Sequence, residues 1–487
     1  MNPPDDKLPE VYDTIVLGGG PAGAAAALIL ARKGRRVVVL EKTTFPRFHV
    51  GESLIPEDMK VFEELGLLEE FESLPRFKKN GVEFALGDNS AGSRIKFAQS
   101  LTPGAKETFN IERAVLDDAM LSAARRAGAE VRCDCRVEKI LQLQDGDVRV
   151  QTAQGELRGK YLVDATGQST VVGRHLKTRQ NYTDPSLQKI AYFGHFEHVD
   201  RDNALGEDEI TMVLCDEGWF WMIPIDETRT SIGLVLDAAV AKQVKRPANQ
   251  MLAWGIERCP LVRDRVKHAV HPPTNNSISD YSYTCAPFAG PGYFLVGDAA
   301  TFLDPVFSTG IFLGLEGANE AAHQIDRLLD EKTSPVKAQQ QYTQFLRNGT
   351  RHFFRLIRAY YNPRFRDLFL NGEGPLSMHR AVIAVLAGQV FPRPSWAVRW
   401  RMRAFYACVA LQQWLPLVPR RPGFSLLAET PQPATSPQSA ELATTPPPSG
   451  EVAGEAGRRG QPEYQAAEYS PSPSVAFSDS SPERGAV

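Results

Sequence analysis

The sequence has few cysteines, no long apolar run and no excess of one charge sign. Its 487 residues include six cysteines, and the close pair Cys133 and Cys135 has no second pair to complete a zinc site. No run of about 18 apolar residues is present, as a membrane-spanning helix would require. The balance of 55 basic and 58 acidic residues gives no general attraction for nucleic acid. We therefore expect an enzyme of small molecules, with no metal site, no nucleic-acid partner and no transmembrane segment.

The amino terminus also lacks the features of a targeting signal. The segment MNPPDDKLPE is acidic and contains prolines, whereas a secretory signal peptide is basic and then apolar. The low cysteine content is typical of a reducing compartment. These features predict a cytoplasmic protein.

Length and composition predict several folded regions and a tail. A chain of this length exceeds the usual domain size of roughly 150 residues. Residues 428–487 contain ten prolines, one leucine and no isoleucine or tryptophan, so they lack the apolar surface needed to fold. We expect a two-sheet domain over residues 10–330, a helical region over 331–421 and a disordered tail over 422–487. A spacer or tether role is the functional alternative for the tail.

The chain from Tyr12 has the order strand, glycine turn, helix and strand, in the segments YDTIVLG, GGPAG, AAAALILARKG and RRVVVLE. Such a βαβ unit begins a parallel, doubly wound α/β sheet. Gly18, Gly20 and Gly23 form GxGxxG in the turn, and Glu41 ends the second strand. In this pattern backbone amides approach a pyrophosphate and the acid binds ribose hydroxyls. We expect these residues to bind a dinucleotide, although a purely structural glycine turn is the alternative.

Alternating apolar and polar residues predict antiparallel strands in residues 147–167 and 209–236. A second, antiparallel sheet is therefore expected as an insertion into the nucleotide-binding fold, over about residues 80–112 and 180–285. After Gly310 the pattern becomes helical as far as about Pro419.

A second glycine and acid segment, GDAA at residues 297–300, follows a short apolar strand. Together with GxGxxG and the VDATG segment at residues 163–167, it resembles the flavoprotein monooxygenase superfamily over the first 330 residues. The resemblance implies FAD as the cofactor and Asp298 as one of its contacts. Arg47 in FPRFHVGES and Arg113 in FNIERAVLDDAML are implied as further contacts, although either could be an ordinary surface arginine.

Three more segments resemble the flavin-dependent halogenases. The first, GWFWMIP, matches WxWxIP and places Trp219 and Trp221 on one face of a strand. The resemblance implies that these two indoles wall off the substrate from the flavin. A core aromatic stripe is the alternative, and flavin reductases that saturate prenyl chains carry a similar motif.

The second and third segments are FLDPVFSTG, which matches FxxPxxSxG, and RFKKNG, which contains KxG. The resemblance implies halide binding at Ser308, Thr309 and Gly310, where small residues suit an anion nest; the alternative is a helix amino terminus that packs on FAD. It also implies that Lys79 relays hypohalite, because burial lowers the pKa of a lysine. Lys78 is the competing assignment. The other alternative is that the lysine is an ordinary solvated surface residue.

Tryptophan halogenases have a glutamate before the serine of this turn, where the present chain has Phe307. The chain thus resembles the halogenases of phenols and pyrroles, from about Tyr12 to Pro419. This subgroup implies that a separate flavin reductase supplies FADH2. A C4a-hydroperoxyflavin would then oxidise chloride or bromide to hypohalite. The substrate would be an electron-rich aromatic ring, phenolic or pyrrolic, in natural-product (antibiotic) biosynthesis, and could be tethered to an acyl or peptidyl carrier protein.

Two other functions stay open at this point. One is a flavin-dependent reductase or hydroxylase of a hydrophobic substrate, similar to geranylgeranyl reductases, and the other is a flavin-binding scaffold without turnover. The stretch Arg393–Arg421 interleaves arginines with aromatic residues. It could dock an acidic carrier protein or lie on a membrane surface, and the alternative is an ordinary amphipathic helix that covers the core.

Overall fold

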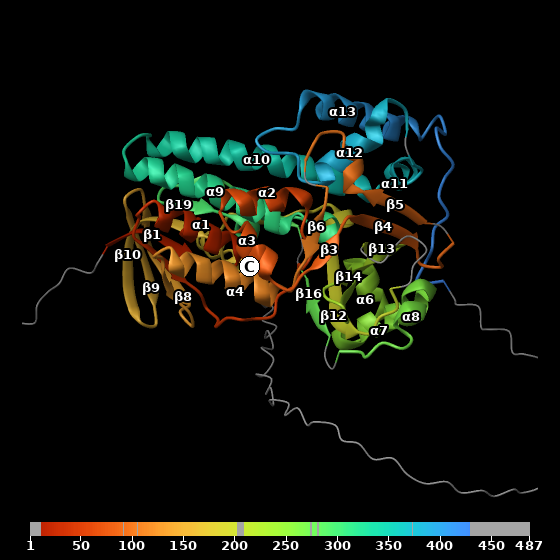
Figure 1. The fold of residues 1–487 in the computed structure, drawn as a ribbon, viewed down its shortest axis with the longest axis horizontal. Coiled ribbons are helices and arrows are strands. Elements are labelled where there is room, and N and C mark those ends of the chain that lie inside the picture. The colour runs from red at the N-terminus through yellow and green to blue at the C-terminus, as the bar shows by residue number, and fades with distance from the viewer. Residues whose placement is uncertain are drawn as a thin grey trace, which may run out of the picture. The chain divides into compact units, whose positions relative to one another are not determined.

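Two β-sheets organise the chain in the computed structural model, which describes residues 11–90, 92–104, 106–201, 209–272, 275–279, 282–372 and 374–428. The first sheet lies beside the amino-terminal helices, and the second lies beside α6 to α8 (Figure 1). A long helical pair, α9 and α10, follows the second sheet in sequence.

The first sheet is a parallel α/β sheet, as predicted. Its strands run in the order β18-β19-β10-β1-β2-β7, and each of β10, β1, β2, β7 and β19 is parallel to its neighbours in that group. An antiparallel extension, β8 and β9, is attached to β10. The bounds are β1 (Val11–Leu17), β2 (Val37–Leu40), β7 (Glu130–Arg132), β8 (Val137–Gln144), β9 (Asp147–Thr152), β10 (Gly155–Asp164), β18 (Ala289–Gly290) and β19 (Tyr293–Leu295).

The second sheet is antiparallel except for one parallel pair, β13 with β4. Its order is β16-β12-β15-β14-β13-β4-β5. The antiparallel strands predicted in residues 147–167 are β9 and β10. Their hairpin belongs to the first sheet and not to the antiparallel second sheet. The bounds are β4 (Gly81–Leu86), β5 (Gly92–Lys96), β12 (Lys189–Glu197), β13 (Ile210–Cys215), β14 (Gly218–Pro224), β15 (Arg229–Asp237) and β16 (Asn276–Ile278).

Two smaller sheets complete the strands that the structure describes. Their members are β3 (Phe77–Lys79) with β6 (Thr108–Asn110), and β11 (Arg179–Asn181) with β17 (Tyr283–Cys285) and β20 (Thr301–Phe302). Short 3-10 helices occur at η1 (Phe97–Gln99), η2 (Gly167–Ser169), η3 (Pro185–Leu187), η4 (Gly297–Ala299), η5 (Pro305–Phe307) and η6 (Pro375–Ser377).

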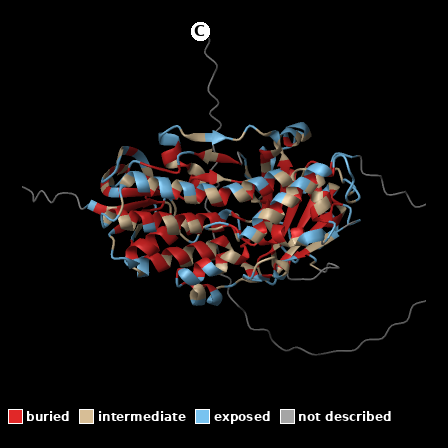
Figure 2. Cartoon of the chain, turned by 90° about the horizontal axis from the view of Figure 1, so that it is seen from above, coloured by how far each residue is buried: buried red, intermediate tan, exposed pale blue. Residues whose placement is uncertain are grey.

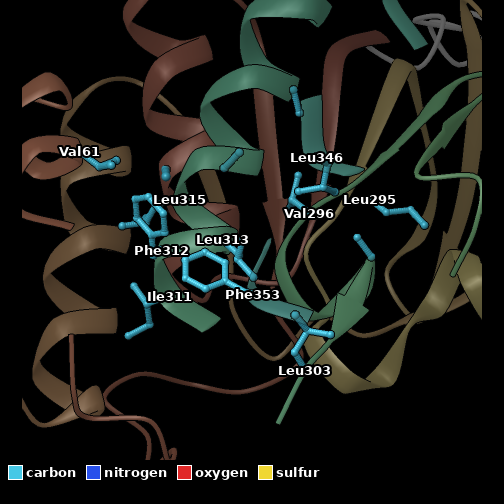
Figure 3. Close-up of a cluster of buried hydrophobic side chains, with 14 of the residues drawn as sticks. Val61, Leu295, Val296, Leu303, Ile311, Phe312, Leu313, Leu315, Leu346 and Phe353 are labelled. Atoms are coloured by element: carbon cyan, nitrogen blue, oxygen red, sulfur yellow. The ribbon is translucent and has the colours of Figure 1, made fainter. Parts of the chain in front are cut away.

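Helix α9 (Gly310–Leu329) is the central helix of the core beside the first sheet. Its apolar residues Phe312 and Leu315 lie near Val61 of α2 (Figure 3). Phe353 of α10 packs on Phe312, with ring centroids 6.3 Å apart. The small residues of α9 allow close packing on α1, whose alanines are almost all buried. The helices in this region are α1 (Pro21–Arg32), α2 (Pro56–Glu64), α3 (Leu68–Ser73), α4 (Arg113–Arg126), α5 (Val171–His175) and α10 (Pro335–Tyr360).

Strand β14 shows that the second sheet separates two apolar clusters. Trp219 and Trp221 belong to the cluster that continues into the first sheet and α9. Phe220 and Met222 belong to a separate cluster under α6 (Ala238–Val244), α7 (Ala248–Arg258) and α8 (Pro260–Val266). Successive side chains of a strand point to opposite faces, so the two tryptophans share one face, as the motif predicts.

The carboxy-terminal region is helical, with α11 (Pro363–Phe369), α12 (Met378–Leu386) and α13 (Trp396–Leu411). Helix α13 buries Val398, Met402, Phe405 and Val409, which recur at helical spacing. It is therefore an amphipathic helix that covers the core, although Trp396 stays 72% exposed. In Figure 2, which views the structure from above, exposed and buried faces alternate along the helices of this side.

Residues 422–428, the first part of the predicted disordered tail, are packed against the folded chain. Leu426 is fully buried, and its N–H donates to the Glu217 carboxylate at 2.8 Å. The Asp216 N–H donates to the Phe424 carbonyl at 2.7 Å. Residues 422–428 therefore pack against the β13–β14 turn, and the remainder of the predicted tail, 429–487, lies outside the described residues.

Within the described ranges, no helix is both long and apolar enough to cross a membrane. The same ranges contain no group of three or more His, Cys, Asp or Glu side chains placed to hold a metal ion.

Truncation at two points tests the role of residues 422–428. Removal of 429–487 should leave the melting temperature unchanged, because that segment has little apolar surface to contribute. Removal of 422–487 should cost about 3 kcal/mol of unfolding free energy, because Leu426 loses its burial and Glu217 loses its backbone donors. Thermal and urea unfolding of both truncated chains measure the difference. Equal stability of the two would contradict the packed role of 422–428.

Candidate active site

The glycine turn after β1 has the close backbone packing that the motif predicts. Gly18 has φ of +94°, and a Cβ there would lie 2.5 Å from the Ala165 carbonyl oxygen. A Cβ at Gly23 would lie 1.9 Å from the Gly18 carbonyl oxygen. Gly20 precedes α1 directly and is half-buried. The amino end of α1 is thus accessible to an anion, which its orphan N–H groups and its dipole favour.

Glu41 fastens this turn to the end of β2. Its carboxylate accepts from the Gly19 N–H at 2.7 Å and from both the N–H and the hydroxyl of Thr43, at 2.9 and 2.8 Å. The side chain is buried beside the turn. It therefore lies where a ribose at the amino end of α1 would reach it.

Arg47 and Arg113 meet at one buried carboxylate that the sequence analysis missed. Asp117 accepts two hydrogen bonds from Arg113, at 2.7 and 2.9 Å, and lies 3.2 Å from Arg47 Nη2. Asp117 follows Arg113 by four residues on α4, a spacing that places the two side chains together. Arg47 also approaches the glycine turn, because its Nη2 lies 3.5 Å from the Cβ position at Gly20. Neither arginine is an ordinary surface residue.

Asp298 links these residues to the start of α9. We call the glycine turn, Glu41, Arg47, Arg113, Asp117 and Asp298 the cofactor cluster. Loss of hydration raises its pKa to about 7, and the positive charge of Arg113 partly opposes that rise. Its Oδ1 lies 4.0 Å from the position that a Cβ would take at Gly310. The predicted cofactor carboxyl therefore lies next to the predicted halide-binding turn, residues 304–310, which we call the halide turn.

The turn from Asp304 to Gly310 is shaped by its own backbone and one carboxylate. Asp304 accepts from the Val306 N–H at 3.0 Å, and the Ser308 N–H donates to the Pro305 carbonyl at 2.9 Å. Ser308 has a left-handed φ of +55°, and Thr309 caps α9. Gly310 is exposed. Such a turn leading into a helix directs N–H groups outward, as anion binding requires.

An aromatic row extends from the Arg47 segment to the tryptophans. The ring centroids of Phe48 and Phe193 are 6.3 Å apart, those of Phe193 and Trp221 are 5.8 Å apart, and those of Trp221 and Trp219 are 5.9 Å apart. Trp221 is held by a 3.1 Å hydrogen bond from its Nε1–H to Ser231. We call these four residues the aromatic wall.

A hydrogen-bonded chain connects the aromatic wall to the halide turn. Trp219 Nε1–H donates to the Tyr361 hydroxyl at 3.0 Å, and that hydroxyl donates to Asp304 Oδ2 at 2.7 Å. Burial raises the pKa of both Tyr361 and Asp304. The Lys189 ammonium lies 4.1 Å from the Tyr361 ring centroid. Sequence reasoning missed this chain, because its members are far apart in sequence.

The structure distinguishes the two lysines of the KxG segment. Lys79 is 1% exposed, and its Nζ donates to Ser53 Oγ at 2.9 Å and to the Leu54 carbonyl at 2.7 Å. Burial lowers the pKa of Lys79 to about 7, against the opposing charge of Asp58. Lys78 instead points to solvent and pairs with Glu107 at 2.8 Å. Of the two, only Lys79 has the buried environment that a relay requires.

The segment that receives Lys79 also carries the end of the aromatic wall. Phe48 and Ser53 lie on the same loop, and the neighbouring Glu52 carboxylate is 2.8 Å from His195 Nε2 of β12. Arg113 donates to the Val50 carbonyl of this loop at 2.9 Å. The loop thus joins the cofactor cluster, the aromatic wall and the lysine in one network.

These residues fit FAD. Arg47 Nη1 is buried and has no protein partner, which suits a phosphate oxygen close to the glycine turn. A side chain at Gly18 or Gly23 would fill the space that lets the turn pack closely. Asp298 supplies a carboxyl next to the halide turn, where it can bond a hydroxyl of the cofactor.

Comparison with known proteins agrees with this geometry. The model of the FAD binding domain family matches residues 11–344. The 1H-pyrrole-2-carbonyl-(peptidyl-carrier protein) chlorinase of Pseudomonas fluorescens is 28% identical, over 82% of this chain and 94% of that protein. The corresponding brominase of Pseudoalteromonas luteoviolacea is 32% identical, over 66% of this chain and 78% of that protein.

Solved structures give the same result. A flavin-dependent brominase has a TM-score of 0.68 at 27% identity, over 82% of this chain and 99% of that chain. The myxobacterial chondrochloren halogenase has a TM-score of 0.67 at 28% identity, over 82% of this chain and 97% of that chain.

Substitution of Tyr361 by phenylalanine tests the chain between the aromatic wall and the halide turn. Tyr361→Phe leaves the Trp219 Nε1–H and the Asp304 carboxyl without their shared partner, at a cost of about 1–3 kcal/mol. Urea unfolding should show this loss. Tyr192→Phe, a buried tyrosine outside the chain, is the matched control and should change stability less. Equal stability of Tyr361→Phe and the parent would show that the hydroxyl bridge contributes nothing.

Proposed function

The chain belongs to the flavin-dependent halogenases, within the family defined by the FAD binding domain, and we propose that it halogenates a pyrrole or another electron-rich aromatic acyl group carried on a carrier protein. The printed activities of the chlorinase and brominase relatives support this substrate class. The observation that carries most weight in the chain itself is the buried Lys79, which is linked through one loop to both the cofactor cluster and the aromatic wall.

The cofactor cluster would hold FAD. The amides at Gly18, Gly20 and Gly23, with Arg47, would bind its pyrophosphate, and Glu41 its ribose. Asp298 would bond the cofactor near the halide turn, and Arg113 would keep Arg47 and Asp117 in place. FAD bound there, once reduced by a partner enzyme, would supply with oxygen the oxidising equivalent needed to convert halide to hypohalous acid.

The turn at Ser308, Thr309 and Gly310 would bind the halide through backbone N–H groups. The carboxyl of Asp304 accepts from both Tyr361 and the Val306 N–H, so the protein already satisfies it. Asp298 lies closer to Gly310, and its pKa of about 7 lowers the negative charge that an anion at the helix start would meet.

Lys79 would transfer the halogen. Its neutral amine attacks the halogen of hypohalous acid, so that an N–halogen bond forms, the O–halogen bond breaks and water leaves. The ring then takes the halogen from nitrogen and loses its proton, which restores the amine. A pKa near 7 makes the neutral amine available at physiological pH, and burial limits reaction of the haloamine with water.

Trp219 and Trp221 would form the face against which the aromatic ring lies, and would separate it from the flavin. Aromatic rings pack well against indole faces. The buried aromatic residue Phe307, which packs on Tyr360 at 5.3 Å between centroids, makes this end of the site apolar. An uncharged ring fits such a surface better than a charged amino acid.

A separate flavin reductase would supply FADH2. The single GxGxxG of the sequence is assigned to FAD, and no second strand-associated copy is present for a nicotinamide cofactor.

Mass spectrometry of products tests the substrate proposal. The enzyme, reduced FAD, oxygen and chloride or bromide should halogenate pyrrole-2-carbonyl on a peptidyl carrier protein, and should convert free pyrrole-2-carboxylate at least tenfold more slowly. NADH without a reductase should give no product. Halogenation of free phenols or pyrroles alone would overturn the carrier requirement, and a halide-independent reduced or hydroxylated product would favour the reductase or hydroxylase alternative.

Substitution of the two lysines tests the relay. Lys79→Ala should bind FAD and consume halide to form free hypohalous acid, yet lose more than about a hundredfold in halogenated product, because no amine positions the halogen. Lys79→Arg should also fail, since a guanidinium stays protonated. Lys78→Ala is the matched control and should keep parental activity.

The pH dependence of the halogenation rate provides a second test of the relay. The neutral fraction of Lys79 increases as pH rises through about 7, so the rate of the halogenation step should rise over that interval and level off above it. Parental product from Lys79→Ala, or loss of product only in Lys78→Ala, would show that the relay is assigned to the wrong residue.

A further inference from the structure

Four arginines form a row on the exposed face of α10. Arg347, Arg351, Arg355 and Arg358 are all exposed, and their spacing of four, four and three residues places them along one side of the helix. The row approaches the carboxy-terminal end of α10, which is followed by Tyr361.

Arg351, Arg355 and Arg358 of this row border a hollow of about 400 Å³. Six residues line the hollow, and three of them are arginines: Arg351, Phe354, Arg355, Arg358, Ala359 and Asn362. No acidic residue belongs to that lining. Arg358 is partly compensated by Asp184 at 2.9 Å, and Arg355 lies 3.9 Å from the ring centroid of Tyr406 on α13. The hollow is therefore built of guanidinium groups with aromatic support.

The lowered pKa of a neighbouring histidine is consistent with a positive field at this surface. The pKa of His352 is lowered to about 4, first by burial and then by the charges of Arg351, Arg355 and Arg399. Arg399 is exposed on α13 and extends the basic surface beyond α10. A surface of this kind attracts anions over a range set by ionic strength.

The hollow lies next to the residues that connect the aromatic wall with the halide turn. Its lining ends at Asn362, and the preceding residue, Tyr361, bonds both Trp219 and Asp304. Phe354 of the lining packs on Tyr182, with centroids 4.8 Å apart. The lining is thus joined covalently, through Asn362, to the residue that bonds Trp219 and Asp304.

We propose that this arginine hollow, formed by Arg351, Arg355 and Arg358, binds the acidic surface of the carrier protein. It would also bind the phosphodiester that attaches the substrate arm to that protein. The inference rests on the proposed function, since it requires a carrier-bound ring. Guanidinium groups bind phosphate and carboxylate oxygens in a bidentate manner, which explains arginine rather than lysine in the row. The aromatic ring on the arm would then reach past Asn362 toward Trp219.

Charge neutralisation with matched controls tests the docking site. In the double variant Arg351→Gln with Arg355→Gln, KM for the pyrrole-2-carbonyl carrier protein should rise at least tenfold, while kcat stays within twofold. The same acyl group presented as a small N-acetylcysteamine thioester should react with unchanged kcat/KM. The control pair Arg263→Gln with Lys267→Gln, exposed near the end of α8, removes the same charge and should leave both substrates unaffected.

Salt dependence provides an independent readout. Between about 0.05 and about 0.5 M salt, the parental KM for the carrier-bound substrate should rise steeply, and that of the double variant should change little. An unchanged KM in the double variant, with the parent active on the carrier-bound substrate, overturns the docking site but leaves the proposed function intact. A parent inactive on every carrier-bound substrate, yet active on free rings, overturns the proposed function first and the docking site with it.

A membrane is the other possible source of negative charge. Co-sedimentation with vesicles of phosphatidylserine and phosphatidylcholine measures this. A loss of vesicle binding in Arg351→Gln with Arg355→Gln, without any change in KM for the carrier-bound substrate, would assign the row to a lipid surface and overturn the proposal.

Discussion

The close approach of α9 to α1 is the constraint on which the site depends. A Cβ at Gly314 would lie 3.3 Å from the Cβ of Ala22, and a Cβ at Gly297 would lie 3.5 Å from the same atom. Small residues at this contact therefore let the amino ends of α1 and α9 lie side by side. Both ends carry orphan N–H groups and a positive dipole, so the glycine turn and the halide turn both suit anions, as the proposed function requires. A larger side chain at this contact would move the two turns apart.

The buried polar groups follow from the same arrangement. Lys79, Asp298 and Asp304 all have pKa values shifted toward their neutral forms because water is excluded around them. Burial of a charge costs free energy unless the group is paired or neutral. The chain meets this requirement with hydrogen bonds: Ser53 and Leu54 hold Lys79, and Tyr361 holds Asp304. The lowered pKa of Lys79, on which the proposed halogen transfer depends, is thus a consequence of how the core is packed.

Much of the fold and several residues of the candidate site could be predicted from the sequence, because their signals are local. The βαβ order, the spacing of the β14 tryptophans and the helical period after Gly310 are each read from neighbouring residues of the chain. The spacing of GxGxxG and KxG likewise selects candidate residues without tertiary information. The missed contacts are long-range, such as Trp219 with Tyr361, which are 142 residues apart. Asp117 had a detectable signal in its spacing from Arg113. The packing of Leu426 had none, because it depends on Glu217, 209 residues earlier.

The distribution of charge around the site explains why one protein could handle a neutral ring attached to an anionic carrier. The wall formed by Phe48, Phe193, Trp221 and Trp219 offers only apolar faces and indole N–H groups that already have partners. Phe307 extends this apolar surface to the halide turn, where a carboxylate would lie buried against Tyr360 at a cost in desolvation. Positive charge is placed instead on the exposed face of α10, where water reduces the desolvation cost of the guanidinium groups. In the proposed function, recognition of the carrier and reaction of the ring would therefore use separate surfaces, and the consecutive residues Tyr361 and Asn362 would connect them.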